Sequence, residues 1–78
     1  MKTYDNLGGN SGVVAYDYDS HMIKVQFDDG WIYEYEASKI GAADFQKMIS
    51  LAESGHGLNS YINRYIRKRF SNKYKAQV

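Results

Sequence analysis

The chain has 78 residues, of which 44% are hydrophobic and 15% aromatic, a composition that suits one small folded domain and not a disordered tail. It has no cysteine, so disulfides and thiolate metal sites are excluded. No run approaches the roughly 18 apolar residues of a membrane span, and no basic segment followed by an apolar run opens the sequence. We therefore expect a soluble cytoplasmic protein.

The net charge of +1 is unevenly distributed along the chain. All nine acidic residues lie in residues 1–53 with four lysines, a balance of −5, whereas residues 54–78 hold six basic residues and no acid, a balance of +6. The asymmetry has two explanations. The basic segment could form a surface for an anionic partner, or it could complement the acidic body of the same domain.

The predicted elements begin after a polar lead over residues 1–11, where glycines and an asparagine indicate a flexible segment. Alternating β-branched and aromatic residues then predict strands over 13–18, 22–27 and 31–36. Asp29-Gly30 predicts a tight hairpin between the second and third strands, because Asp-Gly suits the positive φ of such turns. These strands form an antiparallel meander.

A change of period from 2 to 3.6 marks the helical half of the chain. Phe45, Met48, Ile49 and Ala52 predict a helix over about 42–53, and the glycines of residues 55–57 predict a sharp reversal. A second helix is predicted over about 58–70, with a polar tail over 71–78. The predicted fold class is α+β, one domain over residues 12–70 with a three-stranded antiparallel meander followed by two amphipathic helices packed on one face (β-β-β-α-α).

The last predicted helix carries a basic face. At 100° per residue, Arg64, Arg67 and Lys68 share one side, Tyr61 lies at its edge, and Lys73 follows in the tail. Lysine and arginine neutralise phosphates, and rings stack on unpaired bases, so the pattern suits single-stranded nucleic acid. The alternative is an ordinary solvated helix face.

Three aromatics share one face of the third predicted strand. Alternation places Trp31, Tyr33 and Tyr35 on the same side, opposite Ile32 and Glu34. Such a row is either a platform on which bases stack or a wall of the core. We expect at least one of the two tyrosines to be core.

No constellation in the sequence indicates catalysis or metal binding. Turn chemistry accounts for the aspartates at 17, 19, 28 and 29, and a calcium loop would need a longer ligand run that ends in glutamate. His21 and His56 each lie in a turn without the spacing of a zinc site or a fixed nucleophile beside them. We expect a protein that is not an enzyme and takes no metal or cofactor.

The order of these motifs resembles the KTSC domain, which occurs at the C-terminus of some lysyl-tRNA synthetases and as stand-alone proteins of bacteria and their phages. The likeness spans residues 11–70 and rests on Ser11-x-x-Val14-x-Tyr16-Asp17, the strand Ile23–Phe27, Gly30-x-x-Tyr33-x-Tyr35 and Asn59-x-x-Ile62. The family's Tyr-x-Tyr mark is matched by Tyr33-Glu34-Tyr35. Its common Val-Pro connection is missing here, and the glycine turn is offset by about one residue.

The resemblance implies a small binding domain for which RNA has been suggested as a ligand, with Tyr33 and Tyr35 as the positions concerned. Together with the basic face, it leads to one main hypothesis and one alternative. The main hypothesis is a small non-enzymatic module that binds RNA or single-stranded nucleic acid through the last helix. The alternative is a protein–protein adaptor or homodimer that uses a tyrosine-rich surface. Neither involves a membrane or a small-molecule substrate.

Overall fold

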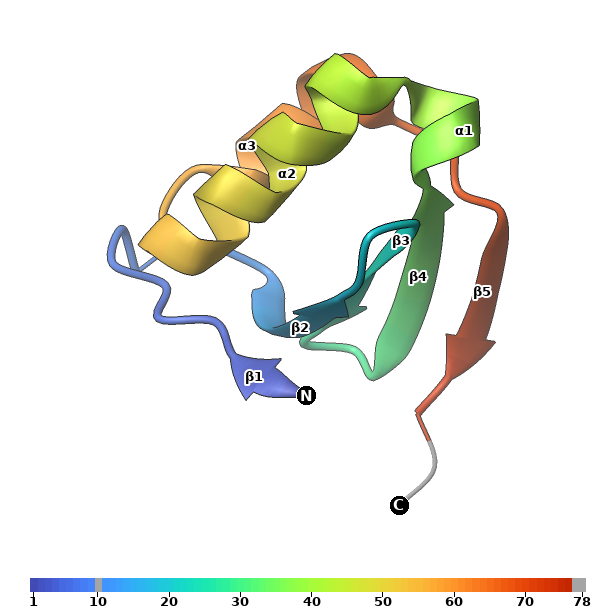
Figure 1. Cartoon of the computed structure of the whole chain (residues 1–78). Coiled ribbons are helices and arrows are strands. Elements are labelled where there is room, and N and C mark those ends of the chain that lie inside the picture. The colour runs from blue at the N-terminus through green and yellow to red at the C-terminus, as the bar shows by residue number, and fades with distance from the viewer. Residues whose placement is uncertain (10, 77–78) are drawn as a thin grey trace.

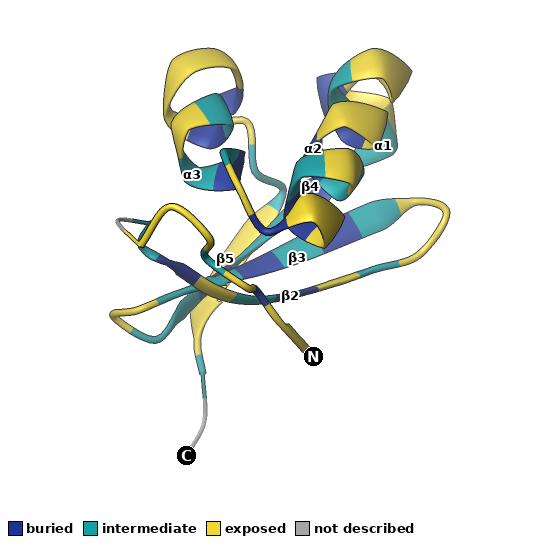
Figure 2. Ribbon diagram, turned by 90° about the vertical axis from the view of Figure 1, so that its left-hand side faces the viewer, coloured by how far each residue is buried: buried dark blue, intermediate teal, exposed yellow. Residues whose placement is uncertain are grey.

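The computed structural model describes residues 1–9 and 11–76, and it shows an α+β domain with helices on one face of an antiparallel sheet (Figure 1; Figure 2). The five strands lie in chain order, β1-β2-β3-β4-β5. They are β1 (Lys2–Thr3), β2 (Val13–Tyr18), β3 (Met22–Phe27), β4 (Trp31–Glu36) and β5 (Asn72–Lys75). The helices are α1 (Ala37–Ile40), α2 (Ala42–Ser54), α3 (Leu58–Tyr61) and the π-helical turn η1 (Ile62–Ile66).

The meander of β2, β3 and β4 has the predicted bounds, and aspartates build both of its turns. Asp19 Oδ1 accepts the backbone N–H groups of His21 at 2.7 Å and Met22 at 2.9 Å. In the β3–β4 turn, Gly30 has φ 90° and donates to the carbonyl of Phe27 at 2.9 Å. Glycine is the residue that adopts this φ without strain, so the prediction of a tight hairpin at Asp29-Gly30 is confirmed.

The strand register decides which side chains meet the helices. Ile23 pairs with Tyr35 and Val25 with Tyr33, so these four side chains lie on the inner face, the side of the sheet that the helices cover (Figure 2). Ile32 and Glu34 consequently lie on the opposite, outer face. The core therefore forms between one face of the meander and the helices.

Helix α2 confirms the predicted amphipathic helix. Phe45, Met48 and Ala52 are buried at helical spacing against the sheet. The helix ends at Gly55, whose left-handed φ of 72° lets its N–H bond back to the carbonyls of Leu51 and Ala52. The preceding turn, α1, was not predicted.

The second predicted helix is shorter than expected, and this is a correction. It was predicted to reach residue 70, but it ends in η1, where the N–H of Arg67 donates to the carbonyl of Ile62 at 2.5 Å. Arg67 then has φ 54°, which no helix accommodates. Arg67 and Lys68 thus lie beyond the helix, and the continuous basic helix face does not exist.

Both chain ends belong to the sheet, so the β-β-β-α-α arrangement is incomplete. Residues 2–3, predicted as part of a flexible lead, pair with β2, and the Tyr4 side chain beside them is buried. Residues 72–75, predicted as a polar tail, form β5 along the edge of β4 (Figure 1). Residues 10 and 77–78 of the predicted lead and tail lie outside the described residues. In the described part of the chain, no helix has the length and apolar character needed to cross a membrane.

Candidate functional site

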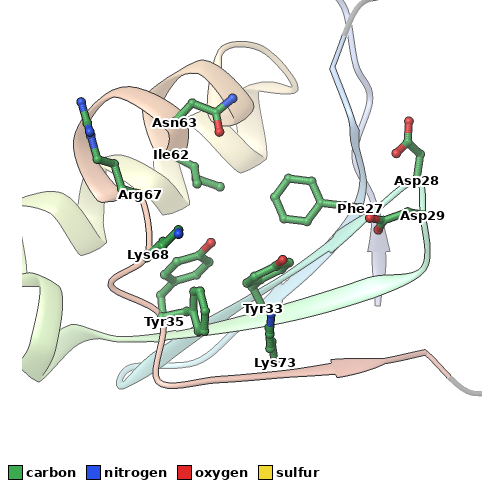
Figure 3. A pocket seen from close by; sticks show the side chains of 11 residues that line it. Phe27, Asp28, Asp29, Tyr33, Tyr35, Ile62, Asn63, Arg67, Lys68 and Lys73 are labelled. Carbon is green, nitrogen blue, oxygen red and sulfur yellow. The ribbon is translucent and has the colours of Figure 1, made fainter.

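A pocket of about 780 Å³ lies between the inner face of the sheet and the end of η1 (Figure 3). Its volume is in the range of pockets that hold small ligands. Strand β4, the β3–β4 turn, η1 with the turn after it, and β5 all contribute to its wall. The lining residues are Phe27, Asp28, Asp29, Tyr33, Tyr35, Ile62, Asn63, Arg67, Lys68, Phe70 and Lys73.

The apolar part of the pocket is an aromatic cluster on β3 and β4 that Phe70 completes. The Tyr33 ring lies edge-on to Phe27 with centroids 5.3 Å apart, and edge-on to Phe70 with centroids 4.9 Å apart. Tyr35 lies beside Tyr33 in a stacked arrangement with centroids 6.5 Å apart. Edge-to-face contacts of this kind are favourable and fix ring orientation, so this wall is preformed.

The basic part of the pocket comes from two separate segments. Arg67 and Lys68 belong to the turn that follows η1, and Lys73 belongs to β5. Lys73 pairs with Tyr33, and this register brings it to the inner face of the sheet. Its Nζ lies 5.3 Å from the centroid of the Trp31 ring and 5.8 Å from that of Phe70, within reach of favourable cation–π interaction.

The opposite end of the pocket is acidic. Asp28 and Asp29 lie in the β3–β4 turn, across the aromatic cluster from Arg67 and Lys68 (Figure 3). Asp29 is held in place, because its Oδ1 accepts the N–H of Trp31 at 3.0 Å and its carbonyl accepts Lys75 Nζ at 2.5 Å. The pocket therefore has a basic end and an acidic end with aromatic rings between them.

Five of the eight candidate residues from the sequence meet in this pocket. They are Tyr33, Tyr35, Arg67, Lys68 and Lys73. Tyr35 is 1% exposed, so the expectation that at least one tyrosine is core is confirmed, and the aromatics of β4 do not form an open row.

The other three candidates do not line the pocket. Arg64 is exposed on η1. Trp31 is half-buried, and its ring centroid lies 5.3 Å from Lys73 Nζ and 5.6 Å from Lys75 Nζ. Tyr61 is directed towards α2, where its hydroxyl donates to Asp44 Oδ1 at 2.6 Å.

The contact between Tyr61 and Asp44 is part of a small surface network. Arg69 Nη2 lies 2.9 Å from Asp44 Oδ2, so the carboxylate receives hydrogen bonds from two partners. The Tyr61 hydroxyl, and secondly Arg69, hold the pKa of Asp44 below its usual value. The same bond to Asp44, followed by burial, raises the pKa of Tyr61 to about 12. This network joins the segment after η1 to α2, and none of its three residues lines the pocket.

Sequence reasoning missed Phe27, Phe70 and the two aspartates of the pocket. Phe70 was placed in a helix, and no signal in the sequence marks the π-helical turn that redirects it. The sequence explained Asp28 and Asp29 as turn residues, and Asp29 does stabilise the turn by accepting the N–H of Trp31. Their position at one end of a pocket was not predicted.

Among the described residues, no group of three histidine, aspartate or glutamate side chains could hold a metal ion. No family model, curated protein or solved structure matches the chain. The pocket is therefore interpreted from its own geometry and charge.

Proposed function

We propose that this chain is a small, non-enzymatic binding module for RNA or other single-stranded nucleic acid, and that the ligand occupies the pocket beside β4 and β5. The observation that carries the proposal is the meeting of Arg67, Lys68 and Lys73 with an aromatic wall in one pocket. Cations neutralise phosphates, and aromatic faces or edges accommodate unpaired bases. The cations follow η1 or lie on β5, and they meet rings of β3 and β4 that lie far earlier in the sequence, which argues for a site and against a merely solvated helix face.

The proposal differs from the sequence hypothesis in its geometry. Phosphates would meet the turn after η1 and the inner side of β5, and not a face of the last helix. Arg64 and Tyr61 have no part in it. The likeness to the KTSC domain remains a prediction, and it points to the same class of ligand through the same pair, Tyr33 and Tyr35.

Fluorescence anisotropy with short labelled RNAs and single-stranded DNAs, at about 50 mM and about 200 mM salt, tests the proposal. Three phosphate contacts give a slope of log K against log salt of about −2 for single strands. We expect Arg67→Ala combined with Lys73→Ala to weaken binding and to reduce that slope. Trp31 gives a second, label-free signal, because its ring lies against Lys73.

The matched control is Lys39→Ala combined with Lys47→Ala, which removes the same charge from exposed positions away from the pocket. If the two double variants weaken binding equally, only net charge matters and the pocket has no special role. Absence of binding at the lower salt concentration would contradict the proposal itself.

Protein–protein interaction or self-association through the outer face of the sheet is the second candidate. The helices leave this face uncovered (Figure 2), and Tyr74, the register partner of Ile32, is 37% exposed on it. Ile32 is buried yet lies outside the main core cluster, so an apolar centre exists on this face. Sedimentation velocity over a concentration series checks it: a strict monomer whose behaviour is unchanged by Tyr74→Ser argues against self-association.

A further inference from the structure

The Tyr35 hydroxyl is the unusual group in the pocket. Tyr35 is 1% exposed and lines the pocket, and no group in residues 1–9 and 11–76 forms a hydrogen bond with its hydroxyl, which stays accessible from the pocket. The hydroxyl of a tyrosine whose ring is buried normally has a hydrogen-bond partner, and from this position only water or a ligand in the pocket can supply one. In Figure 3 the side chains of Tyr33 and Tyr35 rise from β4 into the pocket, towards the end of η1. A ligand that forms a hydrogen bond with Tyr35 would therefore do so from the pocket, in place of water.

Tyr35 acts as a hydrogen-bond donor at neutral pH. Burial, and secondly the charge of Tyr33, hold the pKa of Tyr35 well above its usual range. The phenol consequently keeps its proton, which it can donate. Lys68 and Lys73, on the other walls of the same pocket, are donors only. A partner shared by these groups has to be an acceptor, and a negative charge suits the two ammonium groups.

We propose that the pocket holds the terminal phosphate of a nucleic-acid strand, a phosphomonoester that accepts hydrogen bonds from Tyr33 and Tyr35 and lies between Lys68 and Lys73. This inference rests on the proposed function and names the part of the strand that the pocket recognises. The strand itself leaves the pocket past Arg67 on the basic side.

Two properties favour a strand end over an internal phosphate. A monoester has three free oxygens and a charge of about −1.5 to −2 at neutral pH, whereas an internal diester has two free oxygens and a single charge. The buried position of Tyr35 also requires the anion to enter the pocket, and an internal phosphate would bring chain on both sides of itself. One of those sides would meet Asp28 and Asp29, whose carboxylates repel further phosphates.

The test compares three oligonucleotides of one sequence, with a 5′-phosphate, a 3′-phosphate or hydroxyls at both ends. We expect one phosphorylated form to bind at least about tenfold more tightly than the hydroxyl form, as additional charge-assisted hydrogen bonds require. Inorganic phosphate should compete with the phosphorylated form and leave binding of the hydroxyl form almost unchanged. The preferred end then gives the polarity of the bound strand.

Tyr35→Phe is the decisive variant, because it removes one hydroxyl and keeps the ring in the core. We expect it to reduce the ratio of the affinities for the phosphorylated and hydroxyl strands, because the lost hydrogen bond is the one made to the terminal phosphate. Tyr74→Phe, which removes an exposed hydroxyl on the outer face, is the control. Tyr33→Phe replaces Tyr35→Phe if the latter fails to fold.

Equal affinity for the phosphorylated and hydroxyl strands would overturn this inference and leave the proposed function standing. A preference that survives both tyrosine variants would also overturn it. If no strand binds in any form, the inference and the proposed function fail together, even if inorganic phosphate is bound.

Discussion

Arg67 occupies a backbone conformation that ordinarily belongs to glycine. Its φ of 54° and ψ of −122° match the first central position of a type II′ turn, which the N–H of Arg69 closes on the carbonyl of Ile66 at 3.2 Å. A side chain at this position costs on the order of 1–3 kcal/mol. Retaining arginine there is explained if its charge serves a strand that leaves the pocket, since its guanidinium extends away from the aromatic cluster (Figure 3).

We expect Arg67→Gly to stabilise the protein and to weaken nucleic-acid binding. Relief of the strain outweighs the added entropy of the unfolded chain, for a net gain of about 1 kcal/mol in the free energy of unfolding. Urea unfolding combined with the anisotropy assay measures both effects. Lys68→Gly is the control, because Lys68 has no positive φ and glycine there should destabilise. A destabilised Arg67→Gly protein would show that the turn is not strained.

The hydrogen bond between Tyr61 and Asp44 should make stability depend on pH in two windows. The pKa of Asp44 is lowered in the folded state, so its stabilisation is present above the ordinary pKa of about 4 and is lost as the pH falls below it. The pKa of Tyr61 is raised to about 12, so its stabilisation is present below pH 10 and is lost as the pH rises towards 12.

Tyr61→Phe should therefore be less stable than the parent near neutral pH, with a difference that shrinks in acid and in alkali. Urea unfolding at about pH 3, 7 and 11 measures this difference. Tyr65→Phe serves as the control, because the Tyr65 ring is adjacent to Tyr61 while its side chain is exposed. A difference that stays constant across the three pH values would mean that the bond does not contribute.

At the scale of elements, the sequence predicted those strands and helices in which apolar residues recur with a regular period. The strands β2, β3 and β4 and the helix α2 have alternating or helical apolar positions, and their bounds agree with the prediction to within a residue. The sequence Asn-Lys-Tyr-Lys of β5 has no apolar alternation because all four residues are exposed, so only its pairing with β4 makes it a strand. The end of the last helix at Ile66 was only partly visible, because Leu58, Ile62 and Ile66 continue a helical stripe up to that point. One signal was Arg69, which would project into that stripe, so that either the helix ends before it or its stem packs while its head reaches water.

We expect Tyr74→Pro to detach β5 without unfolding the domain. Proline removes a backbone donor from the middle of this edge strand, whose exposed side chains bury little apolar area. The loss in global stability should be well below the roughly 2–5 kcal/mol of a core truncation such as Ile62→Ala. Nucleic-acid binding should fall as Lys73 is displaced, and Trp31 emission should shift to the red. Tyr74→Ser, which keeps the donor, is the control, and a global loss as large as that of Ile62→Ala would contradict the expectation.

At the scale of the whole molecule, the N-terminal segment is tied to the helical layer. The N–H of Leu7 donates to the carbonyl of Gly55 at 2.8 Å, and the hydroxyl of Tyr4 accepts the N–H of Leu58 at 3.3 Å. A Cβ atom on Gly55 would lie 2.6 Å from that of Asp5. The sequence could not show this anchoring, because the polar composition of residues 1–11 is also that of a free lead.

Gly55→Ala should therefore destabilise the whole domain. Its φ of 72° and the clash with Asp5 together cost about 2 kcal/mol or more. Gly9→Ala is the matched control, because its φ of 76° is similar and nothing lies within 4 Å of the added atom. Thermal unfolding measures the loss of stability in both variants. Equal losses would show that the N-terminal segment moves away from the added methyl group without destabilising the domain.

The sequence predicted which types of residue form the candidate site, but it did not predict where in the fold they come together. Tyr33, Lys68 and Lys73 carry the right chemistry on separate predicted elements, but their meeting depends on two unpredicted features, the end of the helix at η1 and the pairing of β5 with β4. Both features are set by tertiary packing, which local periodicity does not encode.

The order of the strands in the sheet also bears on how the protein folds. Strands β2, β3 and β4 are joined by short turns, whereas β5 reaches β4 only after α1, α2, α3 and η1, so that Trp31 meets Lys75. The entropic cost of loop closure is therefore greatest for the pairing of β4 with β5. Trp31, the single tryptophan, lies in it, and its emission during refolding reports the one strand pairing that is distant in sequence. The same event brings Lys73 to the pocket, so the time course of Trp31 fluorescence is also the time course on which the binding site is completed.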